Sequence, residues 1–265
     1  MERSRPRAVA SWLAALLALV LSLPAGAEDV PVRRWSLPGL EAPAEILVDR
    51  WGVPHLYAGT HYDAFFVQGF NATRDRLWQI DLWRRPGLGR LAEILGPDFV
   101  EQDRAARLFL YRGSMFREWL AYGSDAKRIA EAFTAGINAF VALTEQDPSL
   151  RPPEFDLLAY DPARWAPEDV MRIRSHGLRR NVESGVARAR VACAGGLATD
   201  RDRQPPGTGV DAPKVPEGLD PCAVPDGVLD VYRLAKAPVR LERAGDELAL
   251  RAADPEERAR LETLA

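Results

Sequence analysis

The chain has 265 residues, of which 47% are hydrophobic and 28% are charged, and its formal net charge is −3. This composition is typical of a globular protein, and the length favours one domain or one large piece of a domain. The near-neutral charge balance excludes the strongly basic surface that marks a nucleic-acid-binding protein.

The first 27 residues are expected to be a signal peptide. A basic segment, MERSRPR, precedes the apolar run WLAALLALVLSL, and Ala25 to Ala27 give the small-x-small pattern of a cleavage site. The apolar run is too short for a comfortable transmembrane helix, and an uncleaved anchor is the alternative. We therefore predict an exported chain that begins at Glu28, is periplasmic or secreted, and has no stable membrane anchor after cleavage.

Two strands and a long helix are expected next. Residues 44–59 show strand-like alternation of apolar and polar side chains, and Gly52 supplies the turn between the two strands. A helix is predicted over residues 63–85, with Asp63 as its cap and a break at Pro86.

The segment RDRLWQIDLWRR, residues 74–85, combines six charged residues with five large apolar ones. On a helix the apolar residues point nearly all the way around the axis, which is typical of a buried helix. The interleaved charges must then be partly buried and need partners. Asp81 precedes Arg84 and Arg85 by three and four residues, the favourable acid-then-base order. The segment is either the scaffold of a functional site or a structural ion network.

Two further helices are predicted from spacing and caps. The first is capped by Ser124 or Asp125, and apolar residues recur at helical spacing from Ile129 to Val141. The second begins at Pro167, a residue that the first helical position tolerates, and its inner face extends to Val182.

The remaining chain changes composition. Residues 191–237 are polar and rich in Gly and Pro, as in a surface excursion, and residues 238–265 form a hairpin followed by a helix that stops without a C-cap. Export makes a disulfide between the only two cysteines, Cys193 and Cys222, plausible, and two free buried thiols are the alternative.

No catalytic set of a familiar kind is present. The sequence has no Gly-x-Ser-x-Gly elbow, no His-Glu-x-x-His helix and no Walker loop. The three histidines, His55, His61 and His176, are more typical of packed or solvated residues than of a catalytic base. The carboxylate pair Glu168 and Asp169 is sufficiently explained by its place at a helix start.

Several blocks, in this order and spacing, resemble one family across about residues 44–190. They read VDRWGVPHLYA, then DAFFVQGFNATRDRLWQIDLWRRPGLGRLAEILG, then Asp103 through Arg107, then FDLLAYDPARWAPEDV. As a set they are similar to the N-terminal, or alpha, chain of the penicillin acylase family of N-terminal nucleophile hydrolases.

The resemblance implies a fold and a division of the chain. The complete enzyme would be a four-layer αββα sandwich, to which this chain gives a helix-dominated α+β alpha-chain portion. Residues 28–190 would be the alpha-chain-like region, residues 191–237 an excursion tied by the disulfide, and residues 238–265 part of the linker region.

The resemblance also implies a chemistry. Family members are exported zymogens that cleave themselves and hydrolyse a linear amide in small N-acyl compounds such as penicillins, cephalosporins or acyl-homoserine lactones. The nucleophile is a Ser at the start of a beta chain, and its own α-amine is the base, since such an amine titrates near pH 7.7–8.0. Neither Gly113-Ser114 nor Gly123-Ser124 is followed by the family's Asn residues. We therefore expect no catalytic residue here and no activity without a beta-chain partner.

The family's alpha chain also implies pocket and calcium residues. Counting from Trp165, an Arg-Phe pair of the acyl pocket falls on Asn181 and Val182, and Leu178 lies one turn earlier; all three are candidate substrate-binding residues, with core packing as the alternative. Glu183 is a candidate contributor to a calcium site, although a straightforward count reaches Arg188. Calcium takes six to eight oxygen ligands, so most would come from the beta chain.

Two functions from different classes therefore stand. The first is the alpha-chain portion of a periplasmic N-acyl amidohydrolase. The second is a non-catalytic periplasmic binding module, or a truncated relic of such an acylase.

Overall fold

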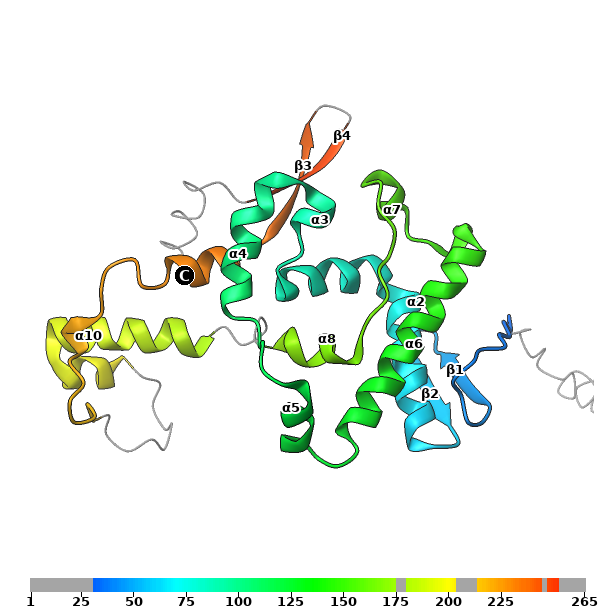
Figure 1. Ribbon diagram of the computed structural model, residues 1–265, viewed down its shortest axis with the longest axis horizontal. Helices are drawn as coiled ribbons and strands as arrows, with labels where there is room; N and C mark the ends of the chain where they lie inside the picture. The colour runs from blue at the N-terminus through cyan, green and yellow to red at the C-terminus, as the bar shows by residue number, and fades with distance from the viewer. Residues whose placement is uncertain (1–30, 175–179, 204–213, 245–246, 253–265) are drawn as a thin grey trace, which may run out of the picture. The chain divides into compact units, whose positions relative to one another are not determined.

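The computed structural model describes residues 31–174, 180–203, 214–244 and 247–252 (Figure 1). The chain divides into two units, Met1–Leu37 and Pro38–Ala265. Within the first unit, the described residues 31–37 contain no helix or strand. The signal peptide predicted over residues 1–27 and the helix predicted after Asp254 lie outside the described residues.

The described elements of the second unit are mostly helices. In chain order they are β1 (Ala44–Val48), β2 (Pro54–Ala58), α2 (His61–Leu88), α3 (Ala92–Leu95), η1 (Pro97–Phe99), α4 (Val100–Leu108), α5 (Met115–Ala121), α6 (Ala126–Gln146), η2 (Pro148–Leu150), α7 (Pro153–Leu157), α8 (Pro167–Arg172), α10 (Arg180–Asp202), η3 (Pro221–Ala223), α11 (Asp230–Ala235), β3 (Val239–Ala244) and β4 (Glu247–Ala252). The architecture is α+β and helix-dominated, as predicted.

Helix α2 is longer at both ends than the sequence indicates. Thr60, not Asp63, is its N-cap, and the Thr60 hydroxyl accepts the Asp63 backbone N–H at 3.1 Å. Pro86 does not break the helix but stands inside its last turn, and the helix continues to Leu88. The helix ends at Gly89, whose positive φ of 64° is the left-handed conformation that glycine adopts at low cost.

The irregularity in α2 lies in its middle instead. Arg76 has non-helical backbone angles, φ −143° and ψ 28°. One turn earlier, the Thr73 hydroxyl donates to the Gly69 carbonyl at 2.7 Å, a contact that competes with backbone pairing and often bends helices. The kink therefore falls at the first residue of the RLWQIDLWRR portion of the helix.

The centre of the core is the crossing of α2 and α6, which lie against each other (Figure 1). Phe70 and Phe140 meet edge to face, with ring centroids 5.4 Å apart. Two glycines allow the helices to approach this closely: a Cβ built on Gly69 would lie 2.0 Å from the Phe133 carbonyl oxygen, and one built on Gly136 would lie 1.9 Å from that of Phe66.

Both predicted hairpins are confirmed. In the first, β1 and β2 pair antiparallel with Ile46 opposite Leu56, and Gly52 takes a positive φ of 80° in the turn. This hairpin packs on α2. In the second, β3 and β4 pair antiparallel with Leu241 opposite Leu250.

The helix predicted from Pro167 to Val182 is interrupted. α8 begins at Pro167 as expected but ends at Arg172, residues 175–179 lie outside the described part, and α10 begins at Arg180. The α10 helix continues to Asp202, so residues 191–202 are helical where an irregular excursion was predicted.

Helix α10 folds back on itself and is tied by a disulfide. Gly196 takes a non-helical φ of 78°, and Arg188 Nε donates to Asp200 Oδ2 at 3.0 Å across twelve residues, a contact that a straight helix cannot make. Cys193 is joined by a disulfide to Cys222 in η3, with Cα atoms 5.0 Å apart. Among the described residues, no helix is both long and apolar enough to cross a bilayer.

The glycine contacts generate the first prediction. We expect Gly136→Ala to lower the free energy of unfolding by about 3 kcal/mol, the upper part of the range for overpacked cores, because the new methyl group meets backbone rather than a side chain that can move. Urea denaturation followed by circular dichroism measures this. The matched control is Gly185→Ala on α10, where nothing lies within 4 Å of the added Cβ, and equal losses in the two variants would contradict the proposed crossing.

Candidate functional site

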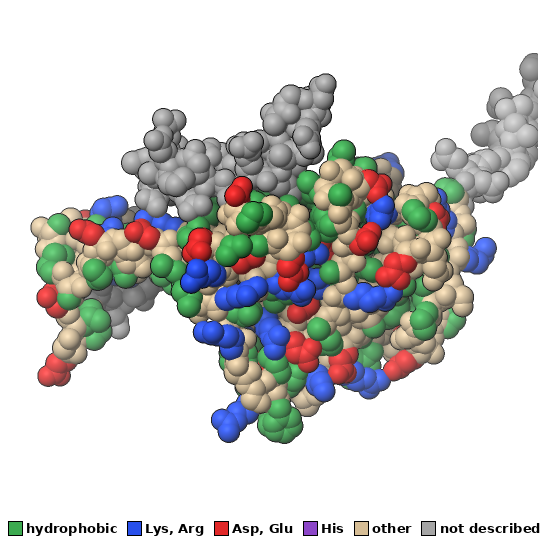
Figure 2. All heavy atoms as spheres, turned by 45° about the horizontal axis from the view of Figure 1, so that its top comes forward, with side chains coloured by type: hydrophobic (Ala, Val, Ile, Leu, Met, Phe, Trp, Pro, Cys, Tyr) green, Lys and Arg blue, Asp and Glu red, His purple; other side chains and the backbone are tan. Residues whose placement is uncertain are grey.

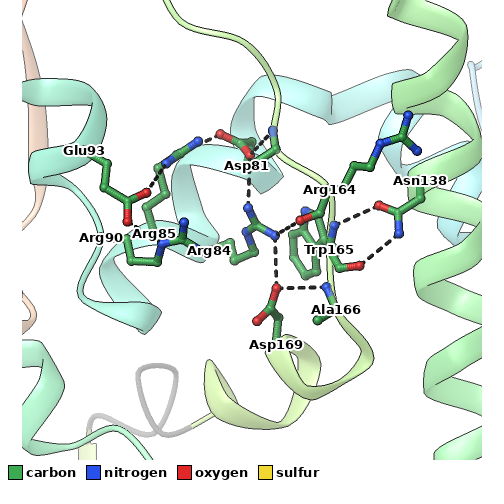
Figure 3. A network of polar contacts seen from close by, with 11 residues as sticks. Asp81, Arg84, Arg85, Arg90, Glu93, Asn138, Arg164, Trp165, Ala166 and Asp169 are labelled. Atoms are coloured by element: carbon green, nitrogen blue, oxygen red, sulfur yellow. Dashed lines mark hydrogen bonds and ion pairs between the residues drawn. The ribbon is translucent and has the colours of Figure 1, made fainter.

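A network of buried ion pairs joins the end of α2 to α8 (Figure 3). Arg84 Nη1 donates to Asp169 Oδ2 at 3.0 Å, and Arg84 Nη2 lies 3.7 Å from Asp81 Oδ1. Arg85 Nε donates to the other Asp81 oxygen at 3.0 Å. Asp81 is fully buried, Arg84 is 1% exposed and Arg85 is 4% exposed. Two carboxylates thus face two guanidinium groups, and the charges balance.

The helical spacing in α2 delivers these groups, as the sequence predicts. Asp81 contacts Arg84 at i+3 and Arg85 at i+4. The expectation that the large apolar residues around them are all buried is wrong in part, because Trp83 is 53% exposed whereas Leu77 is 1% exposed. At this end of α2 the charged residues point into the protein, because oppositely charged and hydrogen-bonding partners lie there.

The partners come from the segment before and within α8. Besides its bond to Asp169, Arg84 Nη1 donates to the Arg164 carbonyl at 2.8 Å, and the Ala163 N–H donates to Asp81 at 3.2 Å. Asp169 also accepts the Ala166 N–H at 3.1 Å, so one carboxylate holds both the α8 start and the arginine. The sequence interpretation of Asp169 as a helix-start residue alone was therefore incomplete.

Trp165 lies at the centre of this segment and is held from two sides. Its ring lies 5.1 Å from the Arg84 guanidinium carbon, a cation–π contact. The Asn138 side chain on α6 clamps its backbone, donating to the Trp165 carbonyl at 2.9 Å and accepting its N–H at 2.8 Å (Figure 3). The segment is thus fixed to α2 and α6 together.

The rim of the network is more exposed. Arg90 Nε donates to Glu93 Oε1 at 2.6 Å, and Arg85 Nη1 reaches Glu93 Oε2 at 3.4 Å. The hydrogen bond from Arg90 is the main cause that holds the pKa of the Glu93 carboxyl below its usual value.

The electrostatics of the network indicate a scaffold rather than a catalytic centre. Burial lowers the pKa of the Arg84 guanidinium, while Asp169 and Asp81 oppose that effect, and an arginine stays protonated in proteins. Each carboxylate already accepts both an arginine and a backbone N–H. Carboxylates tied in this way hold backbone segments in place, so of the two readings of residues 74–85 the structure favours the ion network.

The scaffold leads directly to the predicted pocket segment. A Cβ built on Gly87, at the end of α2, would lie 2.9 Å from Ile173, so α2 touches the residue that follows α8. The next residue, Arg174, contacts Tyr122 after α5, and Tyr122 in turn donates to Glu118 at 3.1 Å. The chain is therefore placed by two contacts immediately before residue 175.

The predicted pocket residues lie just after that point. Leu178 lies outside the described residues. Asn181 and Val182 stand in the first turn of α10, both exposed, with Val182 46% exposed. The Asn181 carbonyl accepts the Ser184 hydroxyl at 3.2 Å. The structure thus brings Asn181 and Val182 together on one turn, and their role in binding an acyl group stays a prediction.

The calcium candidate is placed on the same turn. Glu183 is half-buried in α10, and Arg188, the residue reached by the straightforward count, is paired with Asp200. Within the part of the chain that the structure describes, no group of three or more His, Cys, Asp or Glu side chains could hold a metal ion.

The remaining candidate groups are dispersed. His55 Nε2 lies 3.3 Å from Asp49 on the first hairpin, and His61 is the first residue of α2. His176 lies outside the described residues. Ser114 is the N-cap of α5, where its carbonyl accepts the Glu118 N–H at 3.1 Å, and Ser124 precedes α6.

Sequence reasoning missed two further buried carboxylates of the same design. Asp63 accepts the N–H groups of Glu41 and Ala42 at 2.8 and 3.1 Å, and Asp103 accepts those of Leu91 and Ala92, both at 2.8 Å. Asp63 stands among apolar and aromatic residues, where a carboxylate needs a partner, whereas Asp103 stands between Gln102 and Arg104 and its sequence neighbours give no such signal.

Comparison with known proteins shows a family model and several enzymes that are similar to this chain. A family model described as "Penicillin amidase" matches residues 43–221. Penicillin acylase 2 proenzyme of Pseudomonas sp. (strain SE83) is 39% identical over 132 residues, which are 50% of this chain and 16% of that protein. Penicillin G acylase of Escherichia coli is 33% identical over 144 residues, 52% of this chain and 17% of that protein.

Relatives with a different printed activity also match. Acyl-homoserine lactone acylase QuiP of Pseudomonas aeruginosa is 29% identical over 157 residues, 58% of this chain and 18% of that protein. The chain thus spans about a sixth of the length of the curated relatives it matches. A solved thermostable penicillin G acylase from Alcaligenes faecalis aligns with a TM-score of 0.50 and 25% identity, covering 65% of this chain and 98% of that chain.

The buried network generates a stability prediction. We expect Asp81→Asn to lower the free energy of unfolding by about 3 kcal/mol, because it leaves two buried guanidinium groups with one buried carboxylate, Asp169, and the partly exposed Glu93. Urea denaturation measures the change. The control is Glu101→Gln, which breaks an exposed pair with Arg104 and should cost less than about 0.5 kcal/mol. A small and equal effect of the two variants would show that the network contributes little.

The lowered pKa of Glu93 generates a pH prediction. The folded chain keeps Glu93 ionised to a lower pH than the unfolded chain, whose carboxyl titrates near 4.5, so the stabilisation is present above that pH and is lost as the pH falls through the folded pKa. We expect Glu93→Gln to be less stable than wild type by under about 1 kcal/mol at pH 7, since the pair is partly exposed. Denaturation between pH 7 and pH 3 should show this difference shrinking toward zero, and a constant difference would contradict it.

Proposed function

Because the chain belongs to the penicillin amidase family, whose model matches more than half of it, we propose that it is the alpha-chain portion of an exported N-acyl amidohydrolase that acts together with a beta chain. The enzyme hydrolyses a linear amide bond in a small N-acyl compound. The printed names of the relatives, acylases of penicillin and of acyl-homoserine lactone, support this substrate class.

The proposed division of labour follows from what the described residues do. Their buried aspartates and arginines are engaged in holding backbone segments, which suits a scaffold and not a nucleophile. The proposed nucleophile is an N-terminal Ser on the beta chain, with its own α-amine as the base, because an α-amine titrates close to neutral pH. The alpha chain then contributes the α8–α10 segment with Asn181 and Val182 to the acyl pocket, and Glu183 to a calcium site shared with the beta chain.

Three comparisons support a beta-chain partner. About five sixths of the length of the curated relatives lies outside their match to this chain. One of these relatives is named a proenzyme. In the solved enzyme, almost the whole of one chain, 98%, is covered by 65% of this one, so a separate and shorter chain corresponds to this segment.

The surface of the described residues is consistent with a partner. The first hairpin exposes Leu47, Val48, Trp51, Val53 and Tyr57, of which Trp51 is 72% exposed. Phe116 and Leu120, one turn apart on α5, are 72% and 70% exposed. Apolar side chains also lie at the surface in the view of Figure 2. Large exposed apolar groups of this kind are typical of a surface that another chain covers.

The test is purification from the native host with a tag inserted between Glu28 and Asp29, followed by intact masses and N-terminal sequencing of every co-purifying chain. We expect a larger chain that begins with Ser, and a complex that hydrolyses N-acyl amides such as penicillins or acyl-homoserine lactones. The isolated 265-residue chain is the control and should be inactive.

Two outcomes would contradict the proposal. Amide hydrolysis by the isolated chain would place the nucleophile within it. A soluble, monodisperse chain that melts cooperatively, binds no hydrophobic dye and brings no partner would favour a non-catalytic binding module.

A further inference from the structure

Helix α11 lies beyond the residues that the family model matches, yet it is built into the core. The match ends at residue 221, and α11 spans Asp230–Ala235. Tyr232 is 6% exposed and Ala235 is 2% exposed. A short helix with so little exposed apolar surface on one face is held by what it packs against, and here that element is α4.

Small side chains form the contact between α11 and α4. Ala105 and Ala106 on α4 and Ala235 on α11 make one buried cluster, at 5%, 6% and 2% exposed. The partly buried Leu234 of α11 packs against this cluster. Tyr232 adds an edge-to-face contact with Phe109, with ring centroids 5.4 Å apart.

A buried hydrogen bond fixes the chain just after α11. Gln102, on α4 and 1% exposed, donates from Nε2 to the Ala237 carbonyl at 2.7 Å. Removing residues 229–237 would break this hydrogen bond and expose the apolar surface of α4 at Ala105 and Ala106 to water. The two residues are 135 positions apart in the sequence, so this is a long-range tertiary hydrogen bond.

The other end of the same segment is held independently. The disulfide between Cys193 and Cys222 ties η3 to α10, and η3 precedes α11 by six residues. Residues 222–237 are thus fastened covalently at one end and by a packed helix at the other.

From these two attachments we propose that α11 is a permanent part of the alpha chain, so that the proteolytic step that separates this chain from a beta chain cuts after Ala237. The maturation step rests on the proposed function, whereas the permanence of α11 does not. A cut before Leu229 would strip α4 of its cover at Ala105 and Ala106, and a cut upstream of Cys222 would leave the segment attached through the disulfide.

The first experiment compares two substitutions on α11 in the full chain. Ala235→Asn places a polar group in the α4 contact, and we expect its melting temperature to fall by roughly 5 °C or more. Val231→Asn is the matched control on the exposed face of the same helix, where Val231 is 47% exposed, and should change the melting temperature by less than about 1 °C. Equal shifts would overturn the proposal.

A second measurement on the wild-type chain avoids variants that fail to fold. Lys214 is exposed, whereas Lys236 is 5% exposed beside α11. In a native trypsin digest followed by mass spectrometry, we expect cleavage after Lys214 at least tenfold faster than after Lys236. Similar rates at the two lysines would mean that α11 leaves α4 readily, and would overturn the proposal.

The maturation site itself is read from the native complex. The intact mass of the reduced alpha chain should correspond to an end at or after Ala237, and an end before Leu229 would contradict the inference. If no second chain is found, the proposed function fails, while the unfolding and digestion results still decide whether α11 is permanent.

Discussion

The fold depends on removing two carboxylates and two guanidinium groups from water without leaving any of them unmatched. Asp81 and Asp169 face Arg84 and Arg85 at the point where α2 ends and α8 begins. Isolated burial of any one of these charges would cost several kcal/mol, so the segment before α8 has one acceptable position against α2. From that position the chain continues into α8, which contacts both α2 and α6.

A second principle extends the first. Asp63, Asp81 and Asp103 each project from a helix and accept backbone N–H groups of a segment distant in the sequence. A carboxylate in this role fixes a loop without any regular structure in the loop, since it supplies the acceptors that a neighbouring strand would otherwise give. Helices that bear such residues can organise long connections, which explains how a mostly helical body presents irregular segments in fixed places.

Sequence reasoning found what local rules determine. The turn at Gly52, the Pro167 helix start and the spacing of Asp81 with its two arginines depend on neighbouring residues and were predicted correctly. It failed where a distant partner decides. Pro86 was expected to end a helix, and Asp169 was assigned only a local role, because nothing near them in the sequence shows what they meet. The assignment of Asn181 and Val182 to an acyl pocket depends on a partner chain as well, and it stays a prediction.

The crossing of α2 and α6 has a local twofold symmetry. Gly69 faces the carbonyl three residues before Gly136, and Gly136 faces the carbonyl three residues before Gly69. A single distance between the helix axes therefore requires glycine at both positions. A side chain at either position would force the two helix axes further apart. At that larger distance the other position would no longer require glycine. The two positions therefore share one steric constraint. Sequences that descend from this one should keep both glycines or replace both.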